Sequence, residues 1–442
     1  MEYPQDFRCP NSMELMKDPV TISTHMEYPQ DFRCPISIEL MKDPVTISTG
    51  VTYDRKNIEK WFFTYKKKTC PATMQPVKTY DITPNHTLKR LILAWKNGNN
   101  THCLQPSPSS SPSRPPPRPS SKHEEIVFIF KTIETTPFKL SSLKKLRSLV
   151  DLNDEVRDDF VRLGGVEVLV HVIVVQILME TSDFVAFRAC EEALGILHKI
   201  PIYEESDYCV KILSKPECMK AMAIILQRGS SEARFYAVDL FRKLGKVEYD
   251  WSGLIQDQGI DFFKSLLELV SDDMCKKASS CALEVLIDIL NASKKSRIKA
   301  IEAGAIWVLV ELLPDSSGSK CEKILVLIKL LCKCADGRMA LVEHELGIAA
   351  VSKKLLNVSD GATKMGVKIL WLISSCHPSE RVLEDMLVYG SVKKLLALLH
   401  VNGRSSTKDN ALKMFKLHAN VWKKFPCFPS ELKDYLGLIG DV

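Results

Sequence analysis

The sequence predicts a mostly α-helical protein, with a small α+β module in front of a long α-solenoid. Glycine-containing turns recur before apolar helices in the C-terminal part, at Gly259, Gly304, Gly347 and Gly390, with spacings of 45, 43 and 43 residues. A repeat in the low forties built from helices alone is typical of α-solenoids. The N-terminal part instead combines short extended runs with two short amphipathic helices, which favours a compact α+β unit.

Composition limits the function classes. A chain of 442 residues is too long for one core, so two or more folded units are expected. The net charge of +6 is spread along the chain without a basic run, so nucleic acid is not an expected partner. The 14 cysteines lie mostly singly in apolar segments, which indicates reduced thiols and a protein of the cytoplasm or the nucleus. No signal peptide is expected, because Glu2, Asp6 and Arg8 interrupt any apolar run at the start. No transmembrane segment is expected either, because the longest apolar stretch, 166–179, is interrupted by polar residues.

The chain begins with a partial duplication. Residues 1–24 recur as 26–49, and only Asn11 and Met13 differ from their counterparts Ile36 and Ile38. Only the second copy continues into a helix and a second loop. We therefore expect residues 1–25 to be disordered and dispensable, and residues 26–100 to form the N-terminal module.

The module can be followed element by element. An extended run after Asp43 turns at Thr49-Gly50 and returns through Tyr53. Asp54 is a suitable N-cap for the following helix. Its expected apolar face is Ile58, Trp61, Phe62 and Tyr65. A second loop spans 69–73, and Asn85 is expected to cap another helix whose apolar face carries Leu88, Leu91, Ile92 and Trp95.

Residues 101–123 are rich in proline and serine, and such a stretch cannot form a core. We interpret it as a semi-rigid spacer, with an SH3-type ligand as the alternative. Residues 124–442 then form about six helical repeats, from a degenerate start near Ile126 to a capping end near Trp422. The slot between Gly165 and Gly259 is filled by a unit that begins at Pro216 without a glycine.

Two loops around a central helix suggest a RING-like layout, but zinc ligands are too few. A RING needs eight Cys or His ligands for two tetrahedral sites. Between Phe32 and Trp95 the sequence offers only Cys34, Cys70 and His86. A zinc RING is therefore excluded, and the sequence implies no metal and no cofactor.

The module resembles the U-box, a metal-free relative of the RING. The matching motifs are CPISxELMxDPVxxxTGxTYDRxxIExW, TCPxTxQ and TPNxxLKxLI. In this family hydrogen bonds and ion pairs replace zinc, and the resemblance gives this bracing role to Ser37, Glu39, Asp43, Tyr53 and Arg55. The helical repeats resemble armadillo repeats, and the combination resembles the plant U-box/armadillo ligases.

The resemblance implies an E3 ubiquitin-protein ligase, a RING-type (U-box) ubiquitin transferase that binds a ubiquitin-charged E2 without a covalent intermediate and so has no catalytic nucleophile. It places the E2-binding surface at Ile36, Ile38, Trp61 and Pro71. The armadillo repeats would bind the protein substrate, in plant stress or immune signalling, and the U-box would also allow homo-oligomerisation. Related ligases often have an arginine directly after the Pro-x-Thr of the second loop, and this chain has Met74 at that position.

Three other interpretations compete with this one. A scaffold or adaptor with weak or no ligase activity is the main alternative, and Met74 favours it. A covalent mechanism would need a reactive cysteine, whereas Cys34 and Cys70 are expected to support the loops. An import receptor has Trp and Asn four residues apart on the third helices of its repeats. Here Glu311 follows Trp307, and Trp371 and Trp422 are expected outside third helices.

Overall fold

The computed structural model describes most of the chain between Pro29 and Phe428. The described residues are 29–98, 122–136, 139–178, 184–201, 207–247, 249–376, 378–400, 406–426 and 428. The duplicated segment 1–25 and nearly all of the spacer 101–123 lie outside them, so the predictions on these segments stay predictions.

The N-terminal module is built on a three-stranded antiparallel sheet with the order β2-β1-β3. Strands β1 and β2 are joined at Gly50, whose φ of 78° lies in the left-handed region that glycine tolerates best. Val45 and Tyr53 face each other across these strands and are both fully buried. The elements are η2 (Gln30–Phe32), β1 (Pro44–Ile47), β2 (Thr52–Asp54), α1 (Arg55–Glu59), the π-helical turn η3 (Lys60–Thr64), β3 (Ile82–Pro84) and α2 (His86–Gly98).

The predicted apolar helix faces are only partly buried. Ile58 and Phe62 lie in the core, but Tyr65 is 38% exposed because the helix widens into η3 and ends there. On α2, Ile92 is buried whereas Leu91 is 53% exposed. Each predicted apolar face therefore contributes to the core through some of its residues and leaves others, such as Tyr65 and Leu91, exposed.

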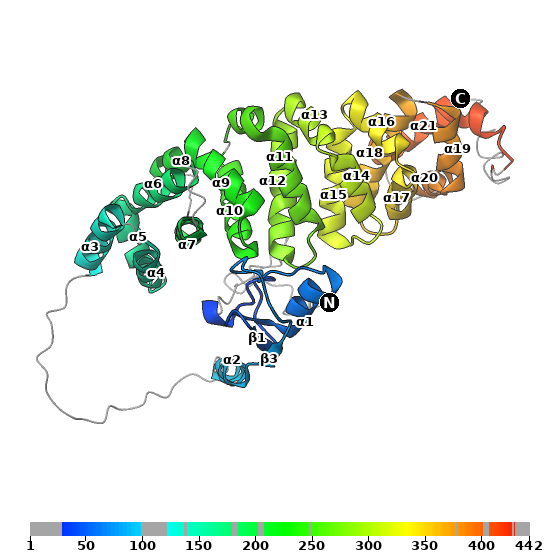
Figure 1. Ribbon diagram of the computed structural model, residues 1–442. Coiled ribbons are helices and arrows are strands. Elements are labelled where there is room, and N and C mark those ends of the chain that lie inside the picture. The colour runs from blue at the N-terminus through cyan, green and yellow to red at the C-terminus, as the bar shows by residue number, and fades with distance from the viewer. Residues whose placement is uncertain are drawn as a thin grey trace, which may run out of the picture.

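The C-terminal region is entirely helical among its described residues and forms a curved array (Figure 1). Its helices are α3 (Lys122–Thr135), α4 (Lys139–Val150), α5 (Asp154–Arg162), α6 (Gly165–Leu178), α7 (Phe184–Lys199), α8 (Asp207–Leu213), α9 (Pro216–Arg228), α10 (Ser231–Gly245), α11 (Ser252–Ser271), α12 (Lys276–Ala292), α13 (Lys294–Glu302), α14 (Ala305–Leu312), α15 (Gly318–Leu331), α16 (Ala335–Glu343), α17 (Gly347–Lys354), α18 (Asp360–Cys376), α19 (Glu380–Val388), α20 (Ser391–His400) and α21 (Ser406–Trp422).

The array repeats as predicted. Helices α4, α7, α10, α12, α15, α18 and α21 pack one against the next. Of these, α15, α18 and α21 are each the third helix of a three-helix unit. Trp371 lies on α18 and Trp422 on α21, so the expectation that both fall outside third helices was wrong. Trp422 is nevertheless fully buried and its indole N–H donates to Leu383 O at 3.1 Å, which is a core role.

The repeat glycines serve two purposes. Gly304 and Gly390 have φ values of 86° and 76°, which let the chain turn sharply into the next helix. At Gly347 a Cβ atom would lie 1.9 Å from the carbonyl oxygen of Leu341, so close packing requires glycine there. The unit at Pro216 needs none, because Pro216 starts α9 directly at its first turn.

The N-terminal module lies against the middle of the array, next to α10 and the α11–α12 turn (Figure 1). Within the described residues no single helix is long and apolar enough to cross a membrane. One pair, α5 with most of α6, passes that test only when combined, across a 70° bend.

Candidate functional site

The two loops of the N-terminal module, loop 1 (34–43) and loop 2 (69–76), share one backbone design. Each begins with a Cys-Pro pair, at Cys34 and Cys70. The N–H four residues later, at Ile38 and at Met74, donates to the cysteine carbonyl at 2.8 Å in both loops. Each cysteine N–H donates in turn to the carbonyl five residues later, at 2.8 Å in loop 1 and 2.9 Å in loop 2. Ile38 and Met74 both have a φ of 58°, so the two turns close in the same way.

Side chains from β2 and α1 hold loop 1. The Asp54 carboxylate accepts from Lys42 N at 2.7 Å and from Asp43 N at 3.2 Å. It occupies the N-cap position of α1 but makes no capping hydrogen bond, so the predicted role of this side chain was wrong. Asn57 on α1 donates to Ser37 Oγ at 2.9 Å. These hydrogen bonds fix the shape of loop 1, which is the task that bound zinc has in a RING.

An ion-pair network joins loop 1 to both helices of the module. Asp43 accepts from Lys89 Nζ at 2.9 Å and from Arg55 Nε at 2.7 Å. Lys89 and then Arg55 lower the pKa of Asp43, so the carboxylate stays charged at neutral pH. Glu39 differs from this group, since its side chain is exposed and its backbone carbonyl is what accepts from Cys34 N.

Tyr53 and Trp61 hold loop 2 from opposite sides. The buried Tyr53 hydroxyl lies 2.9 Å from Cys70 Sγ and accepts from Ala72 N at 3.0 Å. Burial raises the pKa of Tyr53, so this hydroxyl stays protonated. Trp61 lies in the π-helical turn, and its indole N–H donates to Thr69 O at 2.7 Å. Loop 2 is therefore fixed to both the sheet and the helix.

The two loop cysteines support the structure through their sulfurs. Cys34 is 1% exposed and its Sγ accepts from Asp54 N at 3.3 Å. Cys70 is fully buried and its Sγ accepts from Thr49 Oγ1 at 3.3 Å. Neither thiol is open to a substrate. Among the described residues, no group of three or more His, Cys, Asp or Glu side chains is placed to hold a metal ion.

The structure brings two of the predicted E2-binding residues, Ile36 and Trp61, to one groove and leaves little of the four exposed. Ile36 is 1% and Ile38 4% exposed, Pro71 is buried, and Trp61 is partly buried. Ile36 and Trp61 line one groove, whose opposite wall comes from α10, α11 and the α11–α12 turn. In this arrangement the surface faces the helical array instead of solvent.

Sequence reasoning missed part of the bracing. Asn57 reaches loop 1, and Asn85, besides capping α2 through Leu88 N at 3.0 Å, donates to Thr46 Oγ1 and Thr52 Oγ1 at 3.3 Å each. A polar amide directly before or inside a short helix was the available signal. Its partner could not be identified because the partners are far away in sequence.

The comparisons with known proteins agree with this architecture. The family model described as U-box domain matches residues 28–101, and the one described as plant U-box protein ARM repeat region matches residues 124–435. The chain is 34% identical to E3 ubiquitin-protein ligase PUB23 of Arabidopsis thaliana over 98% of this chain and 96% of the relative. It is 32% identical to PUB22 of the same plant, over 98% of each chain.

Among solved structures, a designed armadillo repeat protein aligns with 56% of this chain and 98% of its own length, at 17% identity and a TM-score of 0.42. The two family models together cover the module and nearly the whole helical array. The chain therefore belongs to the plant U-box family with armadillo repeats and is a U-box E3 ubiquitin transferase.

Proposed function

We propose that the U-box binds a ubiquitin-charged E2 without covalent chemistry and promotes ubiquitin transfer to a lysine of a protein held by the armadillo repeats. The observation that carries this proposal is the pair of like-folded loops around Trp61, which donates to loop 2 and lines one groove with Ile36 of loop 1. An aromatic anchor flanked by apolar residues is the usual composition of a small binding hot spot. Ile36, Ile38, Trp61 and Pro71 would form that surface once it is exposed.

The reaction needs no nucleophile from this chain. Both loop cysteines are buried and hydrogen-bonded, which is unsuited to a thioester intermediate. Holding the E2 thioester beside a substrate lysine turns a bimolecular attack into a reaction within one complex, which lowers its entropic barrier. The array offers a long surface of stacked helices for the substrate, as helical repeat proteins do.

Cell context and assembly belong to the same proposal. The resemblance to plant U-box/armadillo ligases supports a role in stress or immune signalling. The described cysteines are all free thiols, which suits the reducing cytoplasm or nucleus. Self-association through the U-box is supported by Leu91, which is 53% exposed on the apolar face of α2.

Discharge of a charged E2 onto free lysine by the full chain tests the proposal. Trp61→Ala removes the anchor, and we expect a loss of E2 affinity of about 30-fold or more, as for a typical hot spot. Trp61→Phe keeps a ring but loses the hydrogen bond to Thr69 O, so a smaller loss is expected. Phe63→Ala is the matched control, because Phe63 lies on the same helical turn and is 59% exposed.

The scaffold alternative has a specific observation in its favour. Met74 is 46% exposed at the position where related ligases often have an arginine, and a thioether cannot donate a hydrogen bond. The same assay separates the two functions. If a panel of E2 enzymes is neither bound nor discharged by the full chain or any of these variants, the scaffold interpretation replaces the ligase proposal.

A further inference from the structure

The apolar residues of the proposed E2-binding surface are packed against the armadillo repeats. Ile38 belongs to the hydrophobic cluster that forms the core of the helical array, and not to the core of its own module. Conversely, Met274 from the α11–α12 turn joins the buried cluster that contains Ile36. Each part thus contributes an apolar residue to the core of the other. Such an exchange keeps both loop-1 isoleucines out of water.

A polar clasp lies beside this apolar contact. The Asp273 carboxylate accepts from Lys60 Nζ at 2.6 Å and from Tyr65 Oη at 2.7 Å. The two donors precede and follow Trp61 on the same helical segment, so the clasp holds the segment that carries the anchor. The hydrogen bonds from Lys60 and then Tyr65 lower the pKa of Asp273, and Asp273 raises that of Lys60. Both groups are therefore charged at neutral pH.

Loop 2 is held from the array as well. Arg188 on α7 donates to Ala72 O at 2.8 Å, directly after Pro71. Its guanidinium is oriented by Glu191 at 2.9 Å, and Glu191 is itself buried and accepts from Ser230 N at 2.7 Å. Arg188 is therefore positioned by the array to meet the loop-2 backbone.

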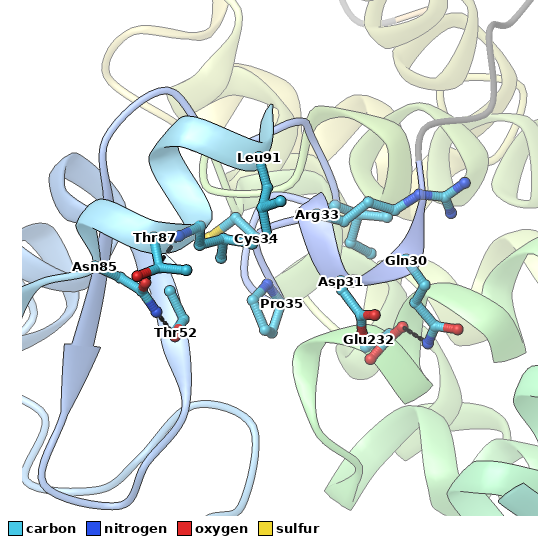
Figure 2. Close-up of a pocket in the computed structure, with 12 residues that line it drawn as sticks. Gln30, Asp31, Arg33, Cys34, Pro35, Thr52, Asn85, Thr87, Leu91 and Glu232 are labelled. Carbon is cyan, nitrogen blue, oxygen red and sulfur yellow. Dashed lines mark hydrogen bonds between the residues drawn. The ribbon is translucent and has the colours of Figure 1, made fainter. Parts of the chain in front are cut away.

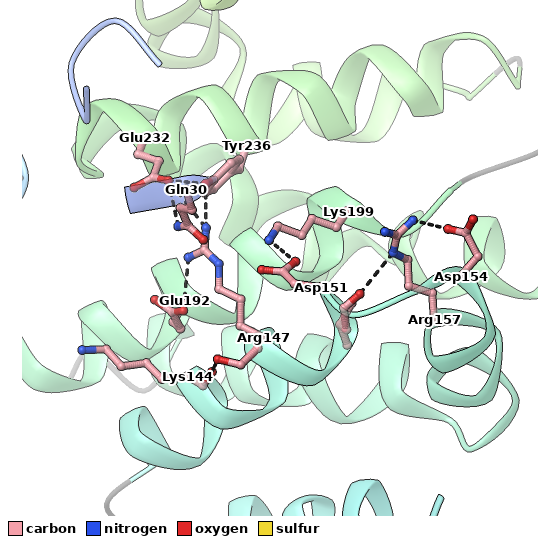
Figure 3. Close-up of polar contacts among 12 residues, drawn as sticks. Gln30, Lys144, Arg147, Asp151, Asp154, Arg157, Glu192, Lys199, Glu232 and Tyr236 are labelled. Carbon is pink, nitrogen blue, oxygen red and sulfur yellow. Dashed lines mark hydrogen bonds and ion pairs between the residues drawn. The ribbon is translucent and has the colours of Figure 1, made fainter. Parts of the chain in front are cut away.

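A fourth contact joins the start of the module to a buried network on the array. Gln30 donates to Glu232 Oε1 at 3.4 Å, as Figure 2 shows. The Tyr236 hydroxyl donates a hydrogen bond to Glu232 and accepts one from the buried Arg147 at 2.8 Å (Figure 3). Arg147 also pairs with Glu192 at 3.1 Å. The array thus contacts the module at four separate points: loop 1, loop 2, Gln30, and the helical segment of α1 and η3 that carries Trp61, here called the anchor helix.

The space that remains is too small for an E2. The groove between Trp61 and the array has a volume of about 480 Å³. That is the size of a small-molecule site, whereas a specific protein interface covers roughly 800 Å² on each partner. An E2 cannot contact Ile36 and Trp61 while α11 and the α11–α12 turn form the opposite wall.

We propose that the armadillo repeats hold the U-box in a closed form that covers its E2-binding surface, and that release from α7, α10 and the α11–α12 turn must precede E2 binding. This inference rests on the proposed function. Because closure and E2 binding exclude each other, the apparent E2 affinity is reduced by the fraction of molecules that are open. Weakening the closed contact therefore activates the ligase.

Two full-chain variants weaken the contact without touching the U-box. Asp273→Lys turns the clasp into a repulsion with Lys60, and Met274→Ser removes the apolar contact with the Ile36 cluster. Asp315→Lys is the matched control, since Asp315 is exposed in the corresponding α14–α15 turn of the next repeat. For Asp273→Lys we expect E2 discharge to rise about threefold to tenfold, because an exposed ion pair stabilises the closed form only modestly. Adding Lys60→Asp to Asp273→Lys should restore an ion pair and return discharge toward the original rate.

Hydrogen–deuterium exchange of peptides from loop 1 and the anchor helix gives a readout that needs no E2. Faster exchange and faster discharge in Asp273→Lys and Met274→Ser, with Asp315→Lys unchanged, support the closed form. Equal discharge in the unmodified chain and Asp273→Lys, with Trp61→Ala inactive, overturns the closed form and leaves the ligase function intact. If no variant discharges an E2, the ligase proposal fails. The closed form then regulates no E2 binding and this inference fails too, whatever the hydrogen exchange of loop 1 shows.

Discussion

Loops 1 and 2 of the U-box have the same backbone but opposite surroundings. Each closes through a residue at φ 58°, yet Ile38 in loop 1 is 4% exposed and Met74 in loop 2 is 46% exposed. Ile38 packs into the core of the armadillo array, whereas Met74 points to solvent. The local sequence thus sets the shape of a turn. The distant array decides which of the two turns is hidden.

The difference matters because both turns carry strain. A non-glycine residue in the left-handed region costs roughly 1–2 kcal/mol. In loop 1, burial of the isoleucine side chain offsets this cost. In loop 2 the Met74 side chain is largely exposed and gives no such compensation, so the backbone bonds of Cys70 and the contacts of Tyr53 and Trp61 must hold the turn. The two loops should therefore respond differently to the same substitution.

Ile38→Gly should give the largest effect. Glycine relieves the left-handed strain but removes a buried side chain, so we expect the free energy of loop-1 opening to fall by about 2–4 kcal/mol. Hydrogen exchange of peptides covering 34–43 in the full chain measures this change. An opening free energy that stays constant would mean that Ile38 does not hold the loop against the array.

Tyr53→Phe should act on loop 2 alone. It keeps the ring but leaves Ala72 N without its acceptor, which costs about 1–3 kcal/mol for a buried donor. Exchange should therefore accelerate in peptides covering 69–76 and stay unchanged in loop 1. Acceleration in both loops would show that the two are coupled through β2 and are not braced separately.

Asp54→Ala is the corresponding change for loop 1. It removes the carboxylate that accepts from Lys42 N and Asp43 N. We expect a loss of about 1–2 kcal/mol in the opening free energy of loop 1, less than for a fully buried group because water can partly replace the acceptor. Asp81→Ala, at an exposed carboxylate of the same module, is the control. A response in loop 2 instead of loop 1 would contradict the assignment of this brace.

The sequence was sufficient for the architecture and for much of the bracing chemistry. Spacing and apolar periodicity predicted the solenoid, and the resemblance to the U-box named motif residues such as Asp43, Arg55 and Tyr53, whose partners lie within the same module. The covering of Ile36 and Ile38 could not be predicted. It depends on pairs such as Lys60 with Asp273, which are about two hundred residues apart and leave no local pattern. The role of Asp54 was missed for a related reason, since a carboxylate before a helix has the capping signature whether or not it caps.

Met74→Gly should have the smallest effect and the opposite sign. The side chain is exposed, so little burial is lost, while the strain at φ 58° disappears. Glycine also adds freedom to the open state, so the net gain should be only about 0.5 kcal/mol. Gln75→Gly is the matched control in the same loop: Gln75 is exposed but has no left-handed strain to relieve, so exchange should accelerate there. If Met74→Gly also accelerates exchange, the exposed thioether contributes more to loop 2 than its strain costs, and the two loops are less alike than their backbones indicate.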